Sequence, residues 1–344
     1  MVLTLKHLHL NPSQLSSVPS DQESEDNKQF KLSLLKEALE LLDSDMWSDS
    51  KQHHSGVVTT FGFPVNQIKY KTEENGQETV SPTGKSDGEG IAWHKRISKL
   101  KASQYGGYDE WWAAVGQNHT EQEKEYVDNL RELIDIGKEE GKEGCFLKLY
   151  KLPFGATDRS FQCRTLVIEP KKEEDSKDSK DDSDPSDESS TLSSKPGSRA
   201  FLSFSLPITT AEPRPEEKKY VRGMTVTVER IEEQDEGKTI VWTCASLSTP
   251  GGSIPVKLGE SKMAASLADA VPPILEWIKT AHPKGSGSGG GGRSNGDMKE
   301  ASAKAPVAAR VTRDLKNPGG GMGLMPSNQF TLAMFQRPVV LRDF

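Results

Sequence analysis

Two glycine-containing segments of this chain are candidates for holding a phosphate. Gly84-Lys85-Ser86 matches the end of a nucleotide-binding loop, but Thr79 stands where that loop needs its first glycine, and no buried strand precedes the segment. The glycine-rich run that follows Lys284 has no helix after it and is typical of a flexible linker. Neither segment therefore predicts a nucleotide site, and the sequence implies no cofactor.

Histidines and cysteines are the other candidates for chemistry. His53 and His54 fall in a polar segment, and His94 and His119 have no partner at metal-ligand spacing, so we expect no metal site. The chain has three cysteines, odd in number and far apart in apolar segments, which predicts buried free thiols in a reducing compartment. The cysteines are Cys145, Cys163 and Cys244. Nucleophilic catalysis would need a serine or cysteine beside histidine and a carboxylate, and the sequence does not place these together.

Composition limits the classes of function. Apolar residues make up 33% of the 344 residues, below the roughly 45–50% of a globular domain, which indicates one core with polar segments around it. The net charge of -7 disfavours nucleic-acid binding, which needs a basic face. Neither an N-terminal signal sequence nor a membrane-spanning segment is predicted. We therefore expect a cytoplasmic protein.

Apolar spacing predicts the elements that would hold a site. Phe30 to Trp47 has apolar residues three and four apart, typical of an amphipathic helix, and Tyr108 to Ile136 predicts one or two helices. Ser48 to Gly88 reads as a loop or a loosely attached strand pair, whereas Ile91 to Leu100 predicts a strand. Five strands then follow at Cys145 to Leu152, Ser160 to Ile168, Ala200 to Ile208, Tyr220 to Ile231 and Thr239 to Leu247.

The order of these elements predicts the fold class. The five strands are joined by short turns and one long polar insertion, which favours an antiparallel sheet. Ser261 to Thr280 is an amphipathic helix that Pro272 and Pro273 should kink or restart. A long C-terminal helix on the concave face of a curved antiparallel sheet is an α+β arrangement that encloses a cavity.

Several segments resemble START lipid-binding domains, in the same order as in that superfamily. Ser248-Thr-Pro-Gly-Gly-Ser-Ile-Pro255 is similar to the D-P-G-G-x-I-P segment before the C-terminal helix, and Ala270-Val-Pro-Pro-Ile-Leu-Glu-Trp277 resembles the V-P-x-F-L helix. Tyr150-Lys-Leu-Pro-Phe154 with Asp158-Arg-Ser-Phe161 resembles the family's tyrosine, turn and Arg-Asp-Tyr run. Trp93-His-Lys-Arg-Ile-Ser98 looks closest to a mainly fungal START-like family of unknown function. The resemblance implies the START-like helix-grip fold, with a curved antiparallel sheet around a long C-terminal helix.

Candidate site residues follow from the predicted cavity. The apolar residues expected to line it are Leu202, Phe204, Leu206, Val226, Val228, Trp242, Leu267, Val271, Ile274 and Ile278. Arg164, Arg222 and Arg230 lie in predicted strands and are the candidate anchors for a polar group. Pro250, Gly251, Gly252, Ile254 and Pro255 form the fold motif. No residue is predicted to be catalytic.

The chain divides into four predicted regions. Residues 1–29 form a polar leader, 30–87 an amphipathic helix with a loop region, 88–281 the START-like domain, and 282–344 a linker and tail. Residues 171–198 form an acidic insertion, which predicts disorder, and we expect it beside the cavity mouth.

The function predicted from these features is non-catalytic binding of a lipid or other apolar ligand. Transfer of that ligand between membranes would add transient membrane contact. Two alternatives stay open: a scaffold with a filled-in domain that acts through the acidic loop and a protein partner of the C-terminal tail, and a cyclase-type or hydrolase-type enzyme on the same fold.

Overall fold

The computed structural model describes most of the predicted domain and the helix that precedes it. The described residues are 3–5, 25–63, 68–74, 77–82, 91–117, 119–137, 144–152, 157–168, 198–208, 213–252 and 256–281. The acidic insertion apart from Ser198, the motif residues Ile254 and Pro255, and the predicted tail at 282–344 lie outside them.

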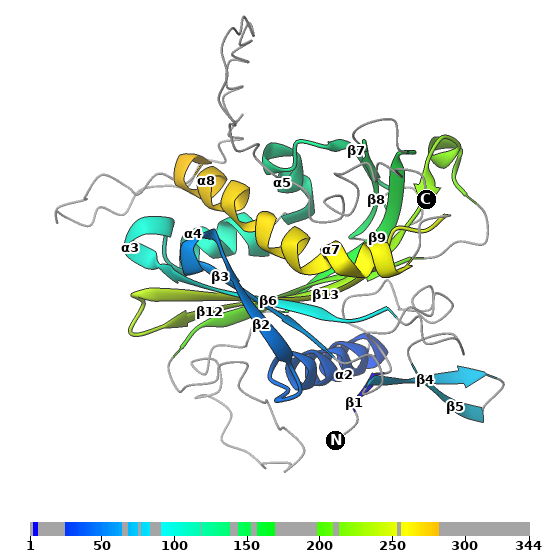
Figure 1. Cartoon of the computed structure of the whole chain (residues 1–344), viewed down its shortest axis with the longest axis horizontal. Helices are drawn as coiled ribbons and strands as arrows, with labels where there is room; N and C mark the ends of the chain where they lie inside the picture. The colour runs from blue at the N-terminus through cyan, green and yellow to red at the C-terminus, as the bar shows by residue number, and fades with distance from the viewer. Residues whose placement is uncertain are drawn as a thin grey trace, which may run out of the picture. The chain divides into compact units, whose positions relative to one another are not determined.

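One large sheet dominates the described residues, and it is antiparallel except where the short β11 joins it (Figure 1). Its strands are β2 (Ser48–His53), β3 (Val58–Gly62), β6 (His94–Lys101), β7 (Leu130–Asp135), β8 (Cys145–Tyr150), β9 (Arg159–Ile168), β10 (Ala200–Pro207), β11 (Val221–Arg222), β12 (Met224–Gln234) and β13 (Thr239–Thr249). The spatial order is β2-β3-β6-β13-β12-β10-β9-β8-β7, with β11 on β9. Strands from the two ends of the domain, β6 and β13, pair side by side, so the sheet is complete only when the whole domain is present.

The remaining elements are helices and a second, smaller sheet. The helices are α2 (Glu25–Leu42), η1 (His54–Gly56), α3 (Ala102–Tyr105), α4 (Tyr108–Trp111), the π-helical turn η3 (Trp112–Gly116), α5 (His119–Tyr126), η5 (Pro215–Glu217), α7 (Val256–Asp269) and α8 (Val271–Ala281). The second sheet joins β1 (Leu3–Leu5), β4 (Ile68–Glu74) and β5 (Gln77–Pro82).

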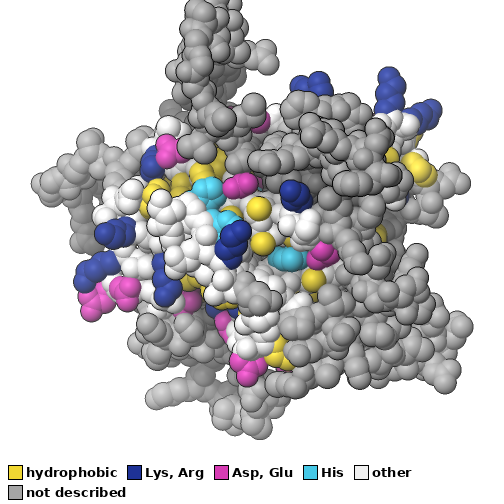
Figure 2. Space-filling view, in the orientation of Figure 1, with side chains coloured by type: hydrophobic (Ala, Val, Ile, Leu, Met, Phe, Trp, Pro, Cys, Tyr) yellow, Lys and Arg dark blue, Asp and Glu magenta, His cyan; other side chains and the backbone are white. Residues whose placement is uncertain are grey.

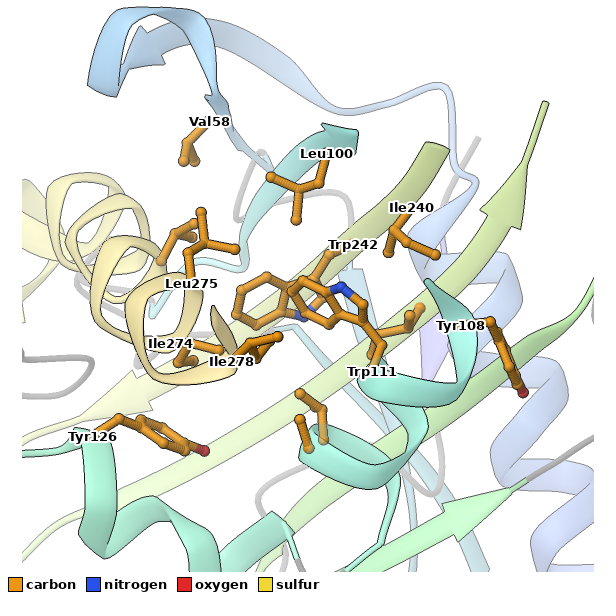
Figure 3. Close-up of a cluster of buried hydrophobic side chains, with 14 of the residues drawn as sticks. Val58, Leu100, Tyr108, Trp111, Tyr126, Ile240, Trp242, Ile274, Leu275 and Ile278 are labelled. Carbon is orange, nitrogen blue, oxygen red and sulfur yellow. The ribbon is translucent and has the colours of Figure 1, made fainter. Parts of the chain in front are cut away.

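Helices cover both faces of the main sheet (Figure 1). On one face, α2 packs Leu34, Ala38 and Leu41 against apolar side chains of β10 and β12. On the other face, α4, η3 and α8 pack around Trp242 and Phe201 (Figure 3). A large curved antiparallel sheet has the C-terminal helix across it, so the predicted α+β helix-grip fold class is confirmed.

The predicted proline break in the C-terminal helix is confirmed. α7 ends at Asp269 and α8 begins at Val271, which places Pro272 and Pro273 in the first turn of the new helix. Prolines are tolerated there because the first amide groups of a helix have no intrahelical acceptor.

Two predicted elements need correction. Leu130–Asp135 is strand β7, which pairs with β8, whereas the sequence predicted a helix through this segment. Pairing with β8 overrides the helix-favouring glutamate and leucine residues, since propensity is weaker than tertiary contacts. The loosely attached segment after the first helix contains β2 and β3, and β3 pairs along β6 in the main sheet.

The fold motif holds a sharp turn after β13. Gly251 has φ +66° and Gly252 has φ +68°, a region that L side chains rarely adopt. A Cβ atom on Gly251 would also collide with the carbonyl oxygen of Arg222. The glycines of the predicted motif are therefore required by the backbone itself.

Gly251→Ala should lower the free energy of unfolding by at least about 1–2 kcal/mol, the cost of a left-handed residue, because the collision adds to it. Urea unfolding measures this loss. Gly62→Ala is the matched control, since a Cβ there would meet nothing within 4 Å. Equal losses for the two variants would contradict the assigned role of Gly251.

Candidate functional site

A cavity of about 110 Å³ lies between the sheet and the helices α5 and α8. Strands β6, β8, β9, β10 and β12 supply its floor, α5 with the residues that follow it supplies one wall, and the start of α8 covers it. Its lining residues are Arg96, His119, Glu123, Tyr126, Val127, Asn129, Lys148, Tyr150, Phe161, Cys163, Thr165, Ser203, Ser205, Thr225, Thr227, Glu229, Ala270 and Ile274. Most of the floor residues therefore carry a polar group, whereas Ala270 and Ile274 make the cover apolar.

Lys148 and Glu123 form the first charged pair of the cavity. The Lys148 Nζ atom donates to both carboxylate oxygens of Glu123 at 2.7 Å. Burial alone would lower the pKa of Lys148, but the charge of Glu123 and its hydrogen bond hold that pKa above its usual range. Lys148 is 6% exposed and stays protonated, so its charge is matched by its neighbour.

Arg96 and Glu229 form the second charged pair. The Arg96 guanidinium is fully buried, donates from Nη2 to Glu229 Oε1 at 3.2 Å, and lies 3.6 Å from the centre of the Trp242 ring. Trp242 Nε1 donates to the same Glu229 oxygen at 3.2 Å. Opposite charge, a ring face and an indole N–H thus stabilise two charges that would otherwise be costly to bury.

His119 lies between the two pairs. Its Nε2 atom is 3.7 Å from Glu123 Oε1, and its Nδ1 atom is 3.9 Å from Glu229 Oε2. These distances exceed those of hydrogen bonds, and Nδ1 is buried without a hydrogen-bond partner among the described residues. The imidazole therefore has a polar atom within the cavity that a ligand could reach.

Three further titratable groups of the cavity, Tyr126, Tyr150 and Cys163, are neutral. Burial raises the pKa of Tyr126, and the charges of Glu123 and Glu229 raise it further. Burial also raises the pKa of Tyr150 and of the Cys163 thiol. These three groups therefore present hydroxyl and thiol groups at neutral pH.

Asn129 is the clearest unsatisfied group of the lining. Both polar atoms of its amide, Oδ1 and Nδ2, are buried and have no hydrogen-bond partner among the described residues. Leaving a buried amide unpaired costs about 1–3 kcal/mol per group. A molecule in the cavity that both donates and accepts hydrogen bonds would recover that cost.

The structure corrects the predicted apolar lining. Leu202, Phe204, Leu206, Val226 and Val228 lie on the opposite face of the sheet, where they pack under α2. Trp242, Val271 and Ile278 belong to the core beside the cavity, and Leu267 is fully buried in α7. Of the ten residues predicted to line the cavity, only Ile274 does so.

The predicted arginine anchors also lie outside the cavity lining. Arg230 donates to both oxygens of Asp43 at 2.7 Å, beyond the end of α2. Arg222 donates from Nε to Glu217 at 2.9 Å. Arg164 is opposite Leu206 and therefore shares the α2 face. Arg96, on a strand that the sequence did predict, is the arginine that lines the cavity.

A visible signal could have identified the correct face. Ser203 and Ser205 alternate with the apolar residues of β10, and Thr225 and Thr227 do the same in β12. The prediction assigned the apolar side of these strands to the cavity, as in a sheet with one covered face. Because α2 needs a surface to bury its own apolar stripe, the sheet has two covered faces, and the polar one lines the cavity.

The three cysteines are buried and free, as predicted. Cys163 lines the cavity, whereas Cys145 and Cys244 do not. No cluster of three or more histidine, cysteine or acidic residues that could bind a metal ion occurs within the described ranges. In the same part of the chain, no helix is long and apolar enough to cross a membrane.

Charged side chains of both signs are interspersed on the described part of the face in Figure 2. Nucleic-acid-binding surfaces instead gather lysine and arginine into one stripe. The described part of this face therefore lacks the basic stripe of a nucleic-acid-binding surface.

Comparison with known proteins gives matches of low sequence identity among solved structures. Human STARD10 is 14% identical over 77% of this chain and 84% of that chain, with a TM-score of 0.44. Human StAR-related lipid transfer protein 5 is 11% identical over 74% of this chain and 99% of that chain, with a TM-score of 0.47. The STAR-related lipid transfer protein of Xanthomonas axonopodis is 11% identical over 68% of this chain and 99% of that chain, with a TM-score of 0.42.

The search of curated proteins found no match. The family described as "Protein of unknown function (DUF3074)" matches residues 93–278, which span more than half of the chain and include β6, the cavity and most of α8. The chain therefore belongs to this family, DUF3074.

Proposed function

We propose that the domain binds a lipid or other apolar ligand in the cavity between the sheet and α8, without changing it chemically. The observation that carries the proposal is the division of the lining into an apolar cover and a polar floor. An amphipathic molecule matches such a lining when its polar end reaches the floor and its apolar part contacts α8. A domain whose interior had been filled by side chains would have no such space.

The size of the cavity sets a condition on this proposal. A cavity of about 150 Å³ holds a benzene-sized molecule, so 110 Å³ accommodates a polar group with a short apolar segment. A longer chain would need more space beneath α8. The short turn at Ala270, between α7 and α8, is where the cover could move.

Ala270→Leu should lower ligand occupancy at least about tenfold, because the larger side chain occupies part of the cavity. The full chain is purified from its own cells, and the bound ligand is measured by native mass spectrometry and lipid extraction. Ala265→Leu is the matched control, since this alanine lies on α7 but is exposed. Wild-type protein without a co-purified ligand, and without uptake of labelled phospholipids, sterols or fatty acids, would contradict the proposal.

Acid–base catalysis is a second candidate because ionisable groups are concentrated in the cavity. His119 lies within 4 Å of two carboxylates, and the neutral Tyr126 could donate a proton. The same mass spectra distinguish the two functions. A ligand that is chemically altered in wild-type protein but unaltered in His119→Asn would favour catalysis, whereas identical ligands in both would favour binding alone.

A further inference from the structure

The charges of the cavity lining cancel in pairs. Lys148 is matched by Glu123 at 2.7 Å, and Arg96 is matched by Glu229 at 3.2 Å. With histidine neutral, the lining carries two positive and two negative charges and no net charge. Each basic group already has its carboxylate, so a ligand anion would have to compete with a buried carboxylate for either one.

The polar atoms that remain for a ligand include those of an amide and one imidazole nitrogen. Both amide atoms of Asn129 and the Nδ1 atom of His119 are buried without hydrogen-bond partners among the described residues. The Asn129 amide offers a donor and an acceptor side by side. This pair of functions matches a hydroxyl or a carboxamide, each of which can also donate and accept.

A charged ligand group would have no matching charge in this lining. Burial of an unmatched ion costs several kcal/mol even after the protein relaxes around it. A neutral hydrogen-bonding group avoids that cost and satisfies Asn129 at the same time.

We propose that the cavity selects ligands whose buried end is neutral and hydrogen-bonding, an alcohol or a primary amide, over ligands with a charged end. The inference rests on the proposed binding function and specifies the chemistry of the ligand. Asn129 receives the neutral group, and the two charged pairs exclude ionised ones.

Four probes with eight carbon atoms each test the selection: 1-octanol, octanamide, octanoate and octylamine. Their binding to the full-length protein is measured by isothermal titration calorimetry at pH 8, above the range in which an ordinary histidine is protonated. We expect the alcohol and the amide to bind about a hundredfold more tightly than the carboxylate and the amine. Octanoate or octylamine binding as tightly as 1-octanol would overturn the inference and leave the binding function intact.

Binding of none of the four probes would instead count against the proposed function itself. The two failures are therefore distinguishable in wild-type protein, without any variant.

Variants test the residues behind the selection. Asn129→Leu should weaken binding of octanol and octanamide about tenfold, the equivalent of one hydrogen bond. Gln117→Leu is the control, because it removes an exposed amide outside the cavity lining. Unchanged binding in Asn129→Leu would overturn the role of Asn129.

Two variants that remove opposite charges test the charge balance of the cavity lining. Glu123→Gln leaves the charge of Lys148 unmatched and should shift selection toward octanoate, at least about tenfold relative to octanol. Lys148→Met leaves Glu123 unmatched and should shift selection toward octylamine by a similar factor. Circular dichroism checks that each variant is folded, and a shift in the same direction for both folded variants would overturn the charge argument.

Discussion

Lys148→Met is expected to lower the free energy of unfolding by about 3–5 kcal/mol, the usual cost of removing one partner of a buried ion pair. The physical reason is the carboxylate left behind. Glu123 accepts both of its short hydrogen bonds at this site from Lys148, and its side chain is only 14% exposed. Urea unfolding of wild type and variant, followed by circular dichroism, measures the loss.

The double variant Glu123→Gln/Lys148→Met separates loss of the pair from loss of packing. Replacing both members of a buried pair is often close to neutral, so the double variant should recover more than half of the loss. Lys238→Met is the exposed control, because Lys238 forms its ion pair on the surface and should lose less than about 1 kcal/mol. If the double variant lost the sum of both single losses, the charged pair would not be the source of the stability.

The two charged pairs, Lys148 with Glu123 and Arg96 with Glu229, explain why polar groups can line the interior of this fold. A carboxylate, an amine, a guanidinium and a second carboxylate would each be costly to bury alone. Two matched pairs reduce that cost, and hydroxyl, amide and thiol groups supply most of the other polar groups of the lining. Stability and the proposed preference for neutral ligands thus depend on the same four side chains.

The order and type of the strands could be predicted from the sequence because each strand is a local pattern. β8, β9, β10 and β13 begin within one residue of their predicted starts. The restart at Val271 was predictable because proline acts on its own helix turn. The fold class follows from the order of these local elements.

The candidate site was less predictable because it depends on which face of each strand meets which helix. Leu202 and Ser203 are neighbours in sequence, and a strand sends them to opposite faces. Assigning the apolar face to the cavity put five strand residues in the predicted lining that in fact lie on the α2 side: Leu202, Phe204, Leu206, Val226 and Val228. The predicted alternation of apolar and polar residues along the strands was correct. Only the assignment of each face of the sheet, to α2 or to the cavity, was wrong.

The charged pairs were unpredictable for a different reason. Arg96 and Glu229 are 133 residues apart, and Lys148 and Glu123 come from a strand and a helix that meet only in the folded domain. Nothing in local spacing distinguishes Arg96 from Arg230, which pairs with Asp43 on the other face. The discriminating information is the register of β6 on β13, which the sequence pattern alone does not supply.

Trp242→Ala is the second large expected loss, at about 3–5 kcal/mol in the free energy of unfolding. Trp242 is 1% exposed, its ring centre lies 5.2 Å from that of Trp111, and both rings lie between the sheet and α8 (Figure 3). Truncation would create a void there, remove the ring face under Arg96, and remove the indole donor to Glu229.

Trp242→Phe divides this loss into two parts, because it retains a ring beneath Arg96 but removes the N–H donor. Trp242→Phe should retain more than half of the free energy of unfolding that Trp242→Ala loses. The part that it does lose measures two changes together: the missing hydrogen bond to Glu229 and the smaller ring. Trp277→Ala is the matched control on α8, since that indole is only half-buried and should cost less. Equal losses for Trp242→Ala and Trp277→Ala would contradict the central place of Trp242.

Because Trp242 supports both members of the Arg96 pair, we expect its loss to weaken octanol binding as well, whereas Trp277→Ala should leave that binding unchanged.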